Sequence, residues 1–240
     1  MTRTITLLSG GMDSTTALAL AARESTPVLA LSVDYGQRHA KELDAAAAIA
    51  RHYGVPHQVL DLTGWGRLLT GSALTDSTVP VPHGHYAAPN MAVTVVPNRN
   101  ATMLMAAAGI ADALEATEVW AAVHAGDHTV YADCRPEFIT AANATLNVST
   151  EGRVTIRAPF VNATKAEIAR TGHDLAVPFE LTWSCYEGGD VHCGKCGTCT
   201  ERRSAFIDAG VPDPTTYAAS LAETKRQMET APSASNEGRH

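Results

Sequence analysis

The fold is decided by residues 4–23, which read TITLLSGGMDSTTALALAAR. The β-branched and leucine-rich run at residues 4–8 predicts a strand, and the alanine- and leucine-rich run at residues 15–23 predicts a helix. Between them, Gly10 and Gly11 lack the Cβ atoms that would block the close approach of a ligand. At a turn between a strand and a helix, backbone N–H groups and the positive end of the helix dipole can hold phosphate oxygens. This order therefore predicts a phosphate-binding loop.

The side chains around this turn favour a nucleotide site over a simple turn. Ser9, Ser14 and Thr15 add hydroxyl groups, and Asp13 is suited to orienting phosphates through a bound metal ion. The turn differs from a Walker A loop, because no lysine follows after a four-residue gap. A tight turn alone would explain the glycines but not the acidic and hydroxyl residues that follow them. We therefore interpret residues 9–16 as a loop that holds nucleotide phosphates.

Further along the chain, strand-like and helix-like segments alternate. The sequence predicts strands at residues 28–34, 57–62, 118–123 and 154–156, and helices at residues 40–53, 99–114, 136–146 and 165–170. Thr164 and Glu167 have the spacing of a capping box at the start of the last helix. Strands separated by helices imply a parallel sheet with right-handed crossovers. We therefore predict an α/β, Rossmann-like fold with a parallel five-stranded sheet and helices on both faces.

Three segments depart from this alternation. Residues 63–97 are rich in Gly, Thr, Ser, Pro and His and have no sustained period, which predicts a mobile loop within a first domain at residues 1–177. Residues 178–223 contain four of the five cysteines and predict a small C-terminal zinc-binding helical module. Residues 224–240 lack the apolar content to fold alone and predict a flexible tail.

Length, composition and charge limit the class of function. The chain has 240 residues, of which 45% are hydrophobic and 18% charged, enough for one sizeable α/β domain with a small appendage. The net charge of −7 disfavours direct binding of nucleic acid, which needs clustered Lys and Arg, and favours a small-molecule substrate. We find no apolar run of membrane-span length and no signal-peptide pattern, so we expect no membrane association and a cytoplasmic location.

The C-terminal cysteines have the spacing of a metal site. The four are Cys185, Cys193, Cys196 and Cys199, in the pattern C-x7-C-x2-C-x2-C. Four thiolates satisfy one tetrahedral zinc ion and leave no open position, so we predict one structural zinc per chain. Gly194 and Gly197 permit the tight turns of a zinc knuckle. An iron–sulfur cluster is the alternative, because C-x2-C-x2-C also occurs in ferredoxin-like sequences. Cys134 is interpreted as a free cysteine near a substrate loop.

Five segments of the chain, in the same order, resemble the 7-cyano-7-deazaguanine synthase (QueC) family. They are residues 9–16, 34–39, 96–100, 131–138 and 184–206. The first resembles the S-G-G-x-D-S loop of the PP-loop N-type ATP pyrophosphatases and implies their adenine nucleotide alpha hydrolase-like (HUP) fold. Two positions depart from the family pattern, because Ala132 stands where Pro is usual and Asn98 where Gly is common. Neither supplies a functional side chain, so we expect altered loop stiffness.

The resemblance implies a ligase that forms carbon–nitrogen bonds. ATP activates the carboxylate of 7-carboxy-7-deazaguanine as an acyl adenylate, and ammonia converts the adenylate to an amide. A second activation by ATP dehydrates the amide to the nitrile, and AMP and pyrophosphate are released. The resemblance also implies Mg²⁺ with ATP, a structural Zn²⁺, a homodimer, and a place in the synthesis of queuosine or a related deazapurine.

The resemblance also assigns roles to residues at matching positions. The ATP-binding residues are Leu8, Ser9, Gly10, Gly11, Met12, Asp13, Ser14, Thr15, Thr16, Asp34 and Tyr35. The catalytic residues are Asp13, Arg99 and Lys165, the last of which would stabilise the leaving pyrophosphate. The substrate-binding residues are Gln37, Arg38, His39, Asn100, Tyr131, Asp133, Arg135 and Glu137.

Two acids are equal candidates for recognising the base. A deazaguanine ring needs a carboxylate for its N–H and amino donors and a cation near its own carboxylate. Asp133 or Glu137 could meet the first need, and Arg135 could meet the second. Asp127 and His128, a few residues earlier, are interpreted as a solvated surface pair.

Three alternative functions remain open from the sequence. The chain could be another PP-loop enzyme that forms an amide or thiolates tRNA, although a thiolase should have a pair of catalytic cysteines and only Cys134 is spare. It could be a zinc-knuckle module that binds nucleic acid. The acidic net charge and the intact phosphate loop both argue against this alternative. It could also run the same activation chemistry with a different acceptor, such as a protein amine or an antibiotic-pathway intermediate.

Overall fold

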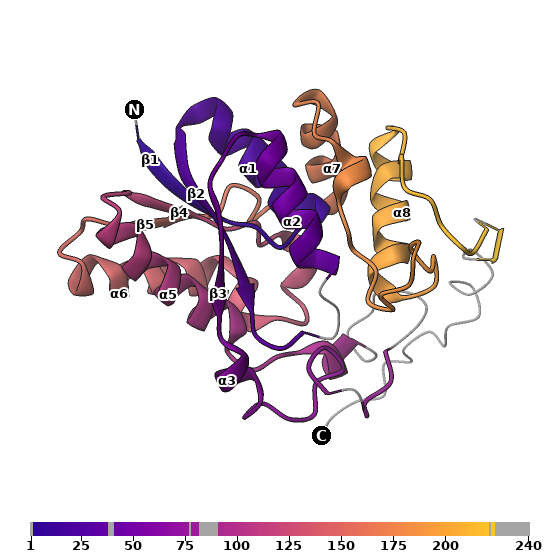
Figure 1. Ribbon diagram of the computed structural model, residues 1–240, viewed down its shortest axis with the longest axis horizontal. Helices are drawn as coiled ribbons and strands as arrows, with labels where there is room; N and C mark the ends of the chain where they lie inside the picture. The colour runs from indigo at the N-terminus through magenta and orange to yellow at the C-terminus, as the bar shows by residue number, and fades with distance from the viewer. Residues whose placement is uncertain (1, 38–40, 77, 82–90, 221, 224–240) are drawn as a thin grey trace, which may run out of the picture.

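One parallel sheet organises the molecule. The computed structural model describes residues 2–37, 41–76, 78–81, 91–220 and 222–223. Within these residues, five strands pair in the order β3-β2-β1-β4-β5, and every pair is parallel (Figure 1). The strands are β1 Arg3–Leu7, β2 Thr26–Asp34, β3 His57–Asp61, β4 Glu118–Trp120 and β5 Thr155–Arg157. The predicted α/β fold with a five-stranded parallel sheet is confirmed.

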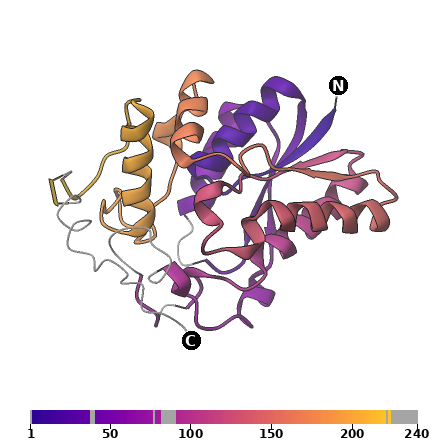
Figure 2. The same ribbon diagram turned by 180° about the vertical axis from the view of Figure 1, so that it is seen from behind.

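Helices cover both faces of this sheet, as the alternation predicts (Figures 1 and 2). The longer helices are α1 Met12–Glu24, α2 Lys41–His52, α5 Arg99–Ala113, α6 Pro136–Ser149, α7 Lys165–Asp174 and α8 Gly197–Ala209. Leu18 of α1 and Ile49 of α2 are fully buried on one face of the sheet. Leu104 of α5 and Leu146 of α6 are buried on the opposite face. The two apolar layers hold the sheet between them and fix the positions of the strand ends.

Some elements end elsewhere than predicted. The strand predicted at residues 118–123 ends at Trp120, where the chain leaves the sheet. The last two predicted helices are each longer at the carboxyl end and reach Ser149 and Asp174. Packing and capping of a terminal turn decide where an element ends, and sequence periodicity does not reveal them.

Two helix starts follow from local chemistry. The capping box predicted for α7 is confirmed, since the Thr164 hydroxyl accepts a hydrogen bond from the N–H of Glu167 at 3.2 Å and the Glu167 carboxylate accepts one from the N–H of Thr164 at 2.7 Å. Asn98 precedes α5 in the left-handed conformation, with φ of 57°. Asparagine tolerates this conformation better than most residues other than glycine, so Asn98 can stand at this helix start.

The segment predicted as a mobile loop at residues 63–97 contains ordered pieces. Within its described residues, the chain forms the short helix α3 Thr63–Gly66 and the 3₁₀ helix η1 Ala92–Thr94. Leu74 and Val96 are buried against Val33 and Tyr35 at the end of β2. These described parts therefore form a wall beside the sheet edge. Residue 77 and residues 82–90 lie outside the described part of the chain, so the prediction of mobility stays untested.

The C-terminal segment packs on the outside of α7. Phe206 of α8 is buried with Phe179 and Met12 in one apolar cluster. Gly172 of α7 allows this approach, because a Cβ atom there would lie 2.4 Å from Phe179 Cζ and 2.7 Å from Thr16 Oγ1. The tail predicted at residues 224–240 lies outside the described residues. Among the helices of the described part, none has both the length and the apolar character needed to cross a membrane.

Candidate active site

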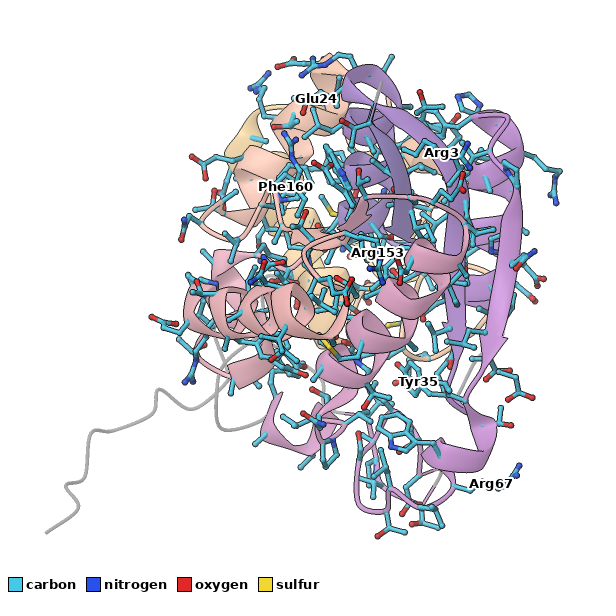
Figure 3. All side chains as sticks on the ribbon, turned by 90° about the vertical axis from the view of Figure 1, so that its left-hand side faces the viewer. Arg3, Glu24, Tyr35, Arg67, Arg153 and Phe160 are labelled. Atoms are coloured by element: carbon cyan, nitrogen blue, oxygen red, sulfur yellow. The ribbon has the colours of Figure 1, made fainter. Side chains whose placement is uncertain are left out.

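A cavity of about 290 Å³ opens at the carboxyl ends of the strands. The loop after β1, residue Tyr35 after β2 and the segment from Ala121 to His124 after β4 all contribute to its wall. The chain runs from β1 through β2 to β3 on one side of β1 and then crosses to β4 and β5 on the other side, so the strand order reverses between β1 and β4. Ligands of open α/β sheets bind at such a switch point. Figure 3 shows Tyr35 toward this end of the molecule, with Arg3 and Glu24 toward the other.

Most of the predicted ligand-binding residues meet in this cavity. Those that line it are Leu8, Ser9, Gly11, Met12, Asp13, Ser14, Tyr35, Gln37, Arg99, Asn100, Tyr131 and Lys165. Four predicted ATP-binding residues adjoin this lining without being part of it: Gly10, Thr15, Thr16 and Asp34. The predicted substrate residues Arg38 and His39 lie outside the described part of the chain.

The phosphate loop has the backbone that its glycines permit. Gly10 has φ of +84°, and a Cβ atom there would lie 2.3 Å from the carbonyl oxygen of Glu42 in α2. The loop is closed by Ser14, whose hydroxyl accepts a hydrogen bond from the N–H of Ser9 at 3.2 Å. Gly11 caps α1 without any side-chain hydrogen bond, so the first N–H groups of the helix are available to an anion beside the cavity.

The hydroxyl groups of the loop divide into two sets. Thr15 Oγ1 donates to the carbonyl oxygen of Gly11 at 2.7 Å, and Thr16 Oγ1 donates to that of Met12 at 2.8 Å. Both threonines are therefore bonded inside the first turns of α1. Ser9 and Ser14 line the cavity, with their hydroxyl oxygens 3.0 Å apart. The serines are thus the hydroxyl groups best placed to meet a phosphate in this arrangement.

A network of charged groups lies beside the phosphate loop. Lys165 Nζ, at the start of α7, is 3.2 Å from Asp13 Oδ2 and 2.6 Å from Glu201 Oε2. Burial alone would lower the pKa of Lys165, but the nearby carboxylates of Asp13 and Glu201 outweigh burial and raise that pKa. His124 Nε2 is 3.8 Å from Asp13 Oδ2 and 3.4 Å from Asp127 Oδ2. The lysine is therefore a charged group held at the phosphate loop.

Asp13 has an oxygen that is suited to a metal ion. Its Oδ1 atom is buried and has no hydrogen-bond partner among the described residues, while its Oδ2 atom faces Lys165. A buried carboxylate oxygen without a partner is costly unless a ligand satisfies it. Oxygen is also the donor that Mg²⁺ prefers. The site thus fits a divalent cation that accompanies nucleotide phosphates.

Aromatic and charged side chains form the far side of the cavity. Arg99 Nη1 donates to the Tyr35 hydroxyl at 3.4 Å, and its guanidinium group lies 5.8 Å from the centre of the Tyr35 ring. Tyr186 joins this wall from the cysteine-rich segment. Glu42 also lines the cavity, and burial raises its pKa to about 7 although Arg99 acts in the opposite direction.

Two of the predicted substrate residues in the cavity, Gln37 and Tyr131, also brace its walls. Gln37 Nε2 donates to the carbonyl oxygen of Val33 at 3.2 Å, and its Oε1 accepts from the N–H of Tyr35 at 3.0 Å. The Tyr131 hydroxyl forms a 2.6 Å hydrogen bond with Thr94 Oγ1. These bonds fix the turn after β2 and tie two loops together at the cavity.

Three predicted substrate residues are not brought into the cavity. Asp133 Oδ2 accepts a hydrogen bond from the N–H of Asn100 at 2.9 Å and so caps the start of α5. Arg135 is exposed and donates to the carbonyl oxygen of His128 at 2.7 Å. Glu137 is exposed on α6. Their assignment to the substrate stays a prediction, and nothing in the geometry of the described residues favours it.

The four C-terminal cysteines converge as their spacing predicts. Their Sγ atoms all lie within 4.8 Å of one another, so the four could hold a metal ion. The N–H groups of Lys195 and Cys196 donate to Cys193 Sγ at 3.3 and 3.2 Å. Such N–H···S bonds orient and stabilise thiolate ligands. Cys134 is a free, buried cysteine that lines the active-site cavity, away from this cluster.

Sequence reasoning missed several residues of the site. Glu42, His124 and Glu201 line the cavity, but no motif singled them out as ligands. The interpretation of Asp127 as a solvated group was wrong, because it lines the cavity beside His124. The only local signal was the position of His124 and Asp127 after a predicted strand, where the carboxyl end of a parallel sheet carries its ligands. Glu42 and Glu201 gave no such signal, since α2 and α8 bring them in by tertiary packing.

The fold and this site define a class of α/β nucleotide-binding proteins with a PP-loop in place of a Walker A loop. Residues 3–210 match the family described as "Queuosine biosynthesis protein QueC". The match covers most of the chain, and the chain belongs to the QueC family.

Named relatives agree with this membership. The chain is 56% identical over 217 residues to the 7-cyano-7-deazaguanine synthase of Rhizobium meliloti (strain 1021), which covers 90% of this chain and 92% of that protein. It is 53% identical to the protein of the same name from Brucella suis biovar 1, over 90% of this chain and 93% of that one. Among solved structures, the NMN synthetase from Francisella tularensis has a TM-score of 0.49 and 15% identity, covering 95% of this chain and 84% of that chain. A structural similarity of that size carries no inference about activity.

Proposed function

We propose that the chain converts 7-carboxy-7-deazaguanine and ammonia to 7-cyano-7-deazaguanine, with ATP consumed as AMP and pyrophosphate. The names of its relatives support the product, and the cavity supports the chemistry. The observation that carries the proposal is the pairing of Asp13 with Lys165 directly beside the phosphate loop. This pair places an oxygen ligand for a metal ion and a partly buried cation beside each other, where phosphate charge would accumulate.

The loop after β1 would bind the β and γ phosphates of ATP. The uncapped N–H groups at the start of α1 and the hydroxyl groups of Ser9 and Ser14 would donate to phosphate oxygens. Asp13 would hold Mg²⁺, which neutralises phosphate charge when it is bound. Lys165 would stabilise the negative charge that develops on the departing pyrophosphate. Glu201 keeps this lysine charged and in position.

The reaction would then run through two activations. In the first, a carboxylate oxygen of the substrate attacks the α phosphorus, pyrophosphate leaves, and an acyl adenylate forms. Ammonia attacks the acyl carbon, and AMP leaves with formation of the amide. In the second activation, the amide oxygen attacks the α phosphorus of another ATP, pyrophosphate leaves, and loss of AMP and protons gives the nitrile. Arg99 is the cavity cation best placed to attract the incoming carboxylate, because Lys165 is held by two acids.

We further propose that the four-cysteine cluster holds one structural Zn²⁺ in each chain. Four thiolates around a tetrahedral ion leave no position for a substrate, so the ion would stabilise the module and take no part in the reaction. Zinc–thiolate bonds of about 2.3 Å separate sulfur atoms by about 3.8 Å. The distance of 3.9 Å between Cys193 Sγ and Cys199 Sγ supports this assignment.

We also propose a homodimer that acts in the cytoplasm, in queuosine or related deazapurine synthesis, without direct contact with nucleic acid. The acidic net charge of −7 supports the last point. Sedimentation velocity at several concentrations would measure the oligomeric state. Salt-sensitive binding of RNA in a filter assay would contradict the absence of a nucleic-acid partner.

The reaction can be tested directly. The protein is incubated with ATP, Mg²⁺, ¹⁵N-labelled ammonia and 7-carboxy-7-deazaguanine, and bases and nucleotides are identified by mass spectrometry. We expect a labelled amide that precedes a labelled nitrile, with AMP and pyrophosphate in proportion. Formation of ADP would contradict attack at the α phosphorus. Formation of AMP without amide or nitrile would indicate that the acyl adenylate passes to another acceptor.

A further inference from the structure

The base of the proposed substrate needs a hydrogen-bond acceptor within the cavity. A 7-deazaguanine ring carries a ring N–H group and an exocyclic amino group side by side, and both are hydrogen-bond donors. A carboxylate accepts two parallel hydrogen bonds from such a pair, and a buried site needs such an acceptor to avoid leaving the donors unpaired. The two acids suggested by the sequence, Asp133 and Glu137, do not line the cavity.

Four carboxylate residues line the cavity among the described residues. They are Asp13, Glu42, Asp127 and Glu201. Three of them already face a basic side chain, because Asp13 and Glu201 face Lys165 and Asp127 faces His124. No hydrogen bond and no ion pair joins the carboxylate of Glu42 to another described residue, and Arg99 acts on it only electrostatically. It is therefore the acceptor that remains available to a ligand.

We propose that Glu42 recognises the base of the substrate, by accepting hydrogen bonds from the ring N–H and the exocyclic amino group of 7-deazaguanine. The inference rests on the proposed function and identifies the residue that sets its specificity. Adenine presents a ring acceptor beside its amino group, so a carboxylate would repel it. Glu42 would thereby separate the base site from the adenosine site within one cavity.

The position of Glu42 suits a substrate that must reach the phosphate loop. Its carbonyl oxygen contacts the loop closely enough that a Cβ atom on Gly10 would lie 2.3 Å away. The helix that carries Glu42 is anchored by Ala46 and Ile49, both fully buried. A base bound at the first turn of this helix would therefore lie beside the bound phosphates. Its carboxylate could then approach the α phosphorus.

The surroundings of Glu42 suit a flat heterocycle. Tyr35 from the end of β2, Tyr186 from the cysteine-rich segment and Arg99 from the start of α5 line the same cavity as Glu42. Arg99 Nη1 donates to the Tyr35 hydroxyl at 3.4 Å. Two aromatic rings, one acid and one cation provide surfaces on which a ring can stack and edges with which it can bond.

The ionisation of Glu42 makes the inference testable by pH. Burial raises its pKa to about 7, and Arg99 only partly opposes that rise. The carboxylate form is the one that accepts two hydrogen bonds, so kcat/KM for the base should fall as the pH decreases through about 7. Tyr35 and Tyr186 stay protonated in this range, since burial raises the pKa of each, and Arg99 stays charged.

The test combines Glu42→Gln with an altered substrate. Glutamine keeps the size of the side chain but offers one acceptor and no charge. We expect kcat/KM for 7-carboxy-7-deazaguanine to fall by roughly 30- to 300-fold, with the KM for ATP changed less than about threefold. The acidic limb of the pH profile should disappear. Asp44→Asn is the matched control, because Asp44 is exposed two residues later on the same helix, and it should leave both constants unchanged.

The second arm uses the substrate analogue without the 2-amino group. In the wild type, kcat/KM for this analogue should be roughly 30-fold or more below that for the full substrate. In E42Q, kcat/KM for the analogue should be less than about threefold below that for the full substrate, because the two changes remove the same interaction. Equal losses in both proteins would overturn the role of Glu42, as would an unchanged kcat/KM for the base in E42Q. If the wild type neither binds the base in calorimetry nor converts it, the proposed function fails, and the inference fails with it.

Discussion

Lys165 is a residue whose charge depends on two acids. It occupies the first position of α7, where the helix dipole disfavours a cation, and burial disfavours the charge as well. The carboxylates of Asp13 and Glu201, at 3.2 and 2.6 Å, outweigh both effects and raise the pKa of Lys165. Such a cation does not have to be assembled when ATP arrives. It is already in place where pyrophosphate would leave.

Substitutions at Lys165 and Glu201 should therefore have graded effects. Lys165→Met keeps the apolar stem and removes the charge, so we expect kcat to fall by about 100- to 1000-fold with a smaller change in the KM for ATP. Glu201→Gln keeps the lysine but removes one of its two anions, and kcat should fall by about tenfold. Steady-state release of pyrophosphate measures both. Glu180→Gln, at an exposed position, is the control, and a loss in E201Q no larger than in E180Q would contradict the positioning role of Glu201.

Gly10 should be irreplaceable for a reason that Gly36 does not share. Both have positive φ, at +84° and +81°, but a Cβ atom on Gly10 would lie 2.3 Å from a backbone oxygen of Glu42, whereas nothing lies within 4 Å of one on Gly36. Gly36→Ala should lower the free energy of unfolding by about 1–2 kcal/mol through backbone strain alone. Gly10→Ala adds displacement of the loop from α2, for a total of about 2–5 kcal/mol, and should abolish ATP binding. Urea denaturation and nucleotide titration measure the two effects, and equal stability losses would refute the contact.

For helices and strands, the sequence predicted the features that depend on neighbouring residues and did not predict those that depend on tertiary packing. The strand, glycine turn and helix at residues 4–23 could be predicted because each part is encoded by neighbouring residues. The capping box at Thr164 could be predicted for the same reason. Glu42 and Glu201 could not be predicted, because they reach the cavity only after α2 packs on β2 and β3 and α8 packs on α7. For Asp133, the sequence did not show that its carboxylate caps the start of α5, where it accepts a hydrogen bond from the N–H of Asn100.

The capping box of α7 connects the stability of an element to the site. Thr164→Ala removes the hydroxyl that accepts from Glu167 N–H, so we expect the free energy of unfolding to fall by about 1 kcal/mol. Lys165 follows directly, and fraying of this turn should also lower kcat. Thr140→Ala is the control, because Thr140 is an exposed residue within α6 whose hydroxyl bonds only the preceding turn, and its loss should be close to zero. Urea denaturation of both variants measures the free energy of unfolding, and equal losses in the two variants would contradict a contribution of the cap to stability.

At the scale of the whole molecule, the cysteine module and the sheet share one active site. The N–H of Trp183 donates to the carbonyl oxygen of Gly10 at 2.8 Å, which ties the segment before the first cysteine to the phosphate loop. Tyr186, Glu201 and Arg202 extend from the same module into the cavity wall. Arg202 is completely buried and donates to Thr182 Oγ1 at 2.7 Å, so this wall is held from within. A metal ion held by the four cysteines would therefore affect catalysis through the positions of these side chains.

Loss of the proposed zinc ion should lower stability and activity together. Cys196→Ser removes one of four thiolates from a buried cluster, and we expect the protein to lose its zinc, to melt at least about 10 °C lower, and to lose most of its turnover as Tyr186 and Glu201 shift. Cys134→Ser is the control for metal content, because Cys134 is a buried cysteine apart from the cluster, and it should retain one zinc per chain by elemental analysis. A brown protein that contains iron and sulfide would contradict the zinc assignment and indicate an iron–sulfur cluster. If C196S kept full activity without metal, the proposed effect of the metal on the active site would be contradicted. The contacts through Trp183 would then be enough to hold the phosphate loop in place.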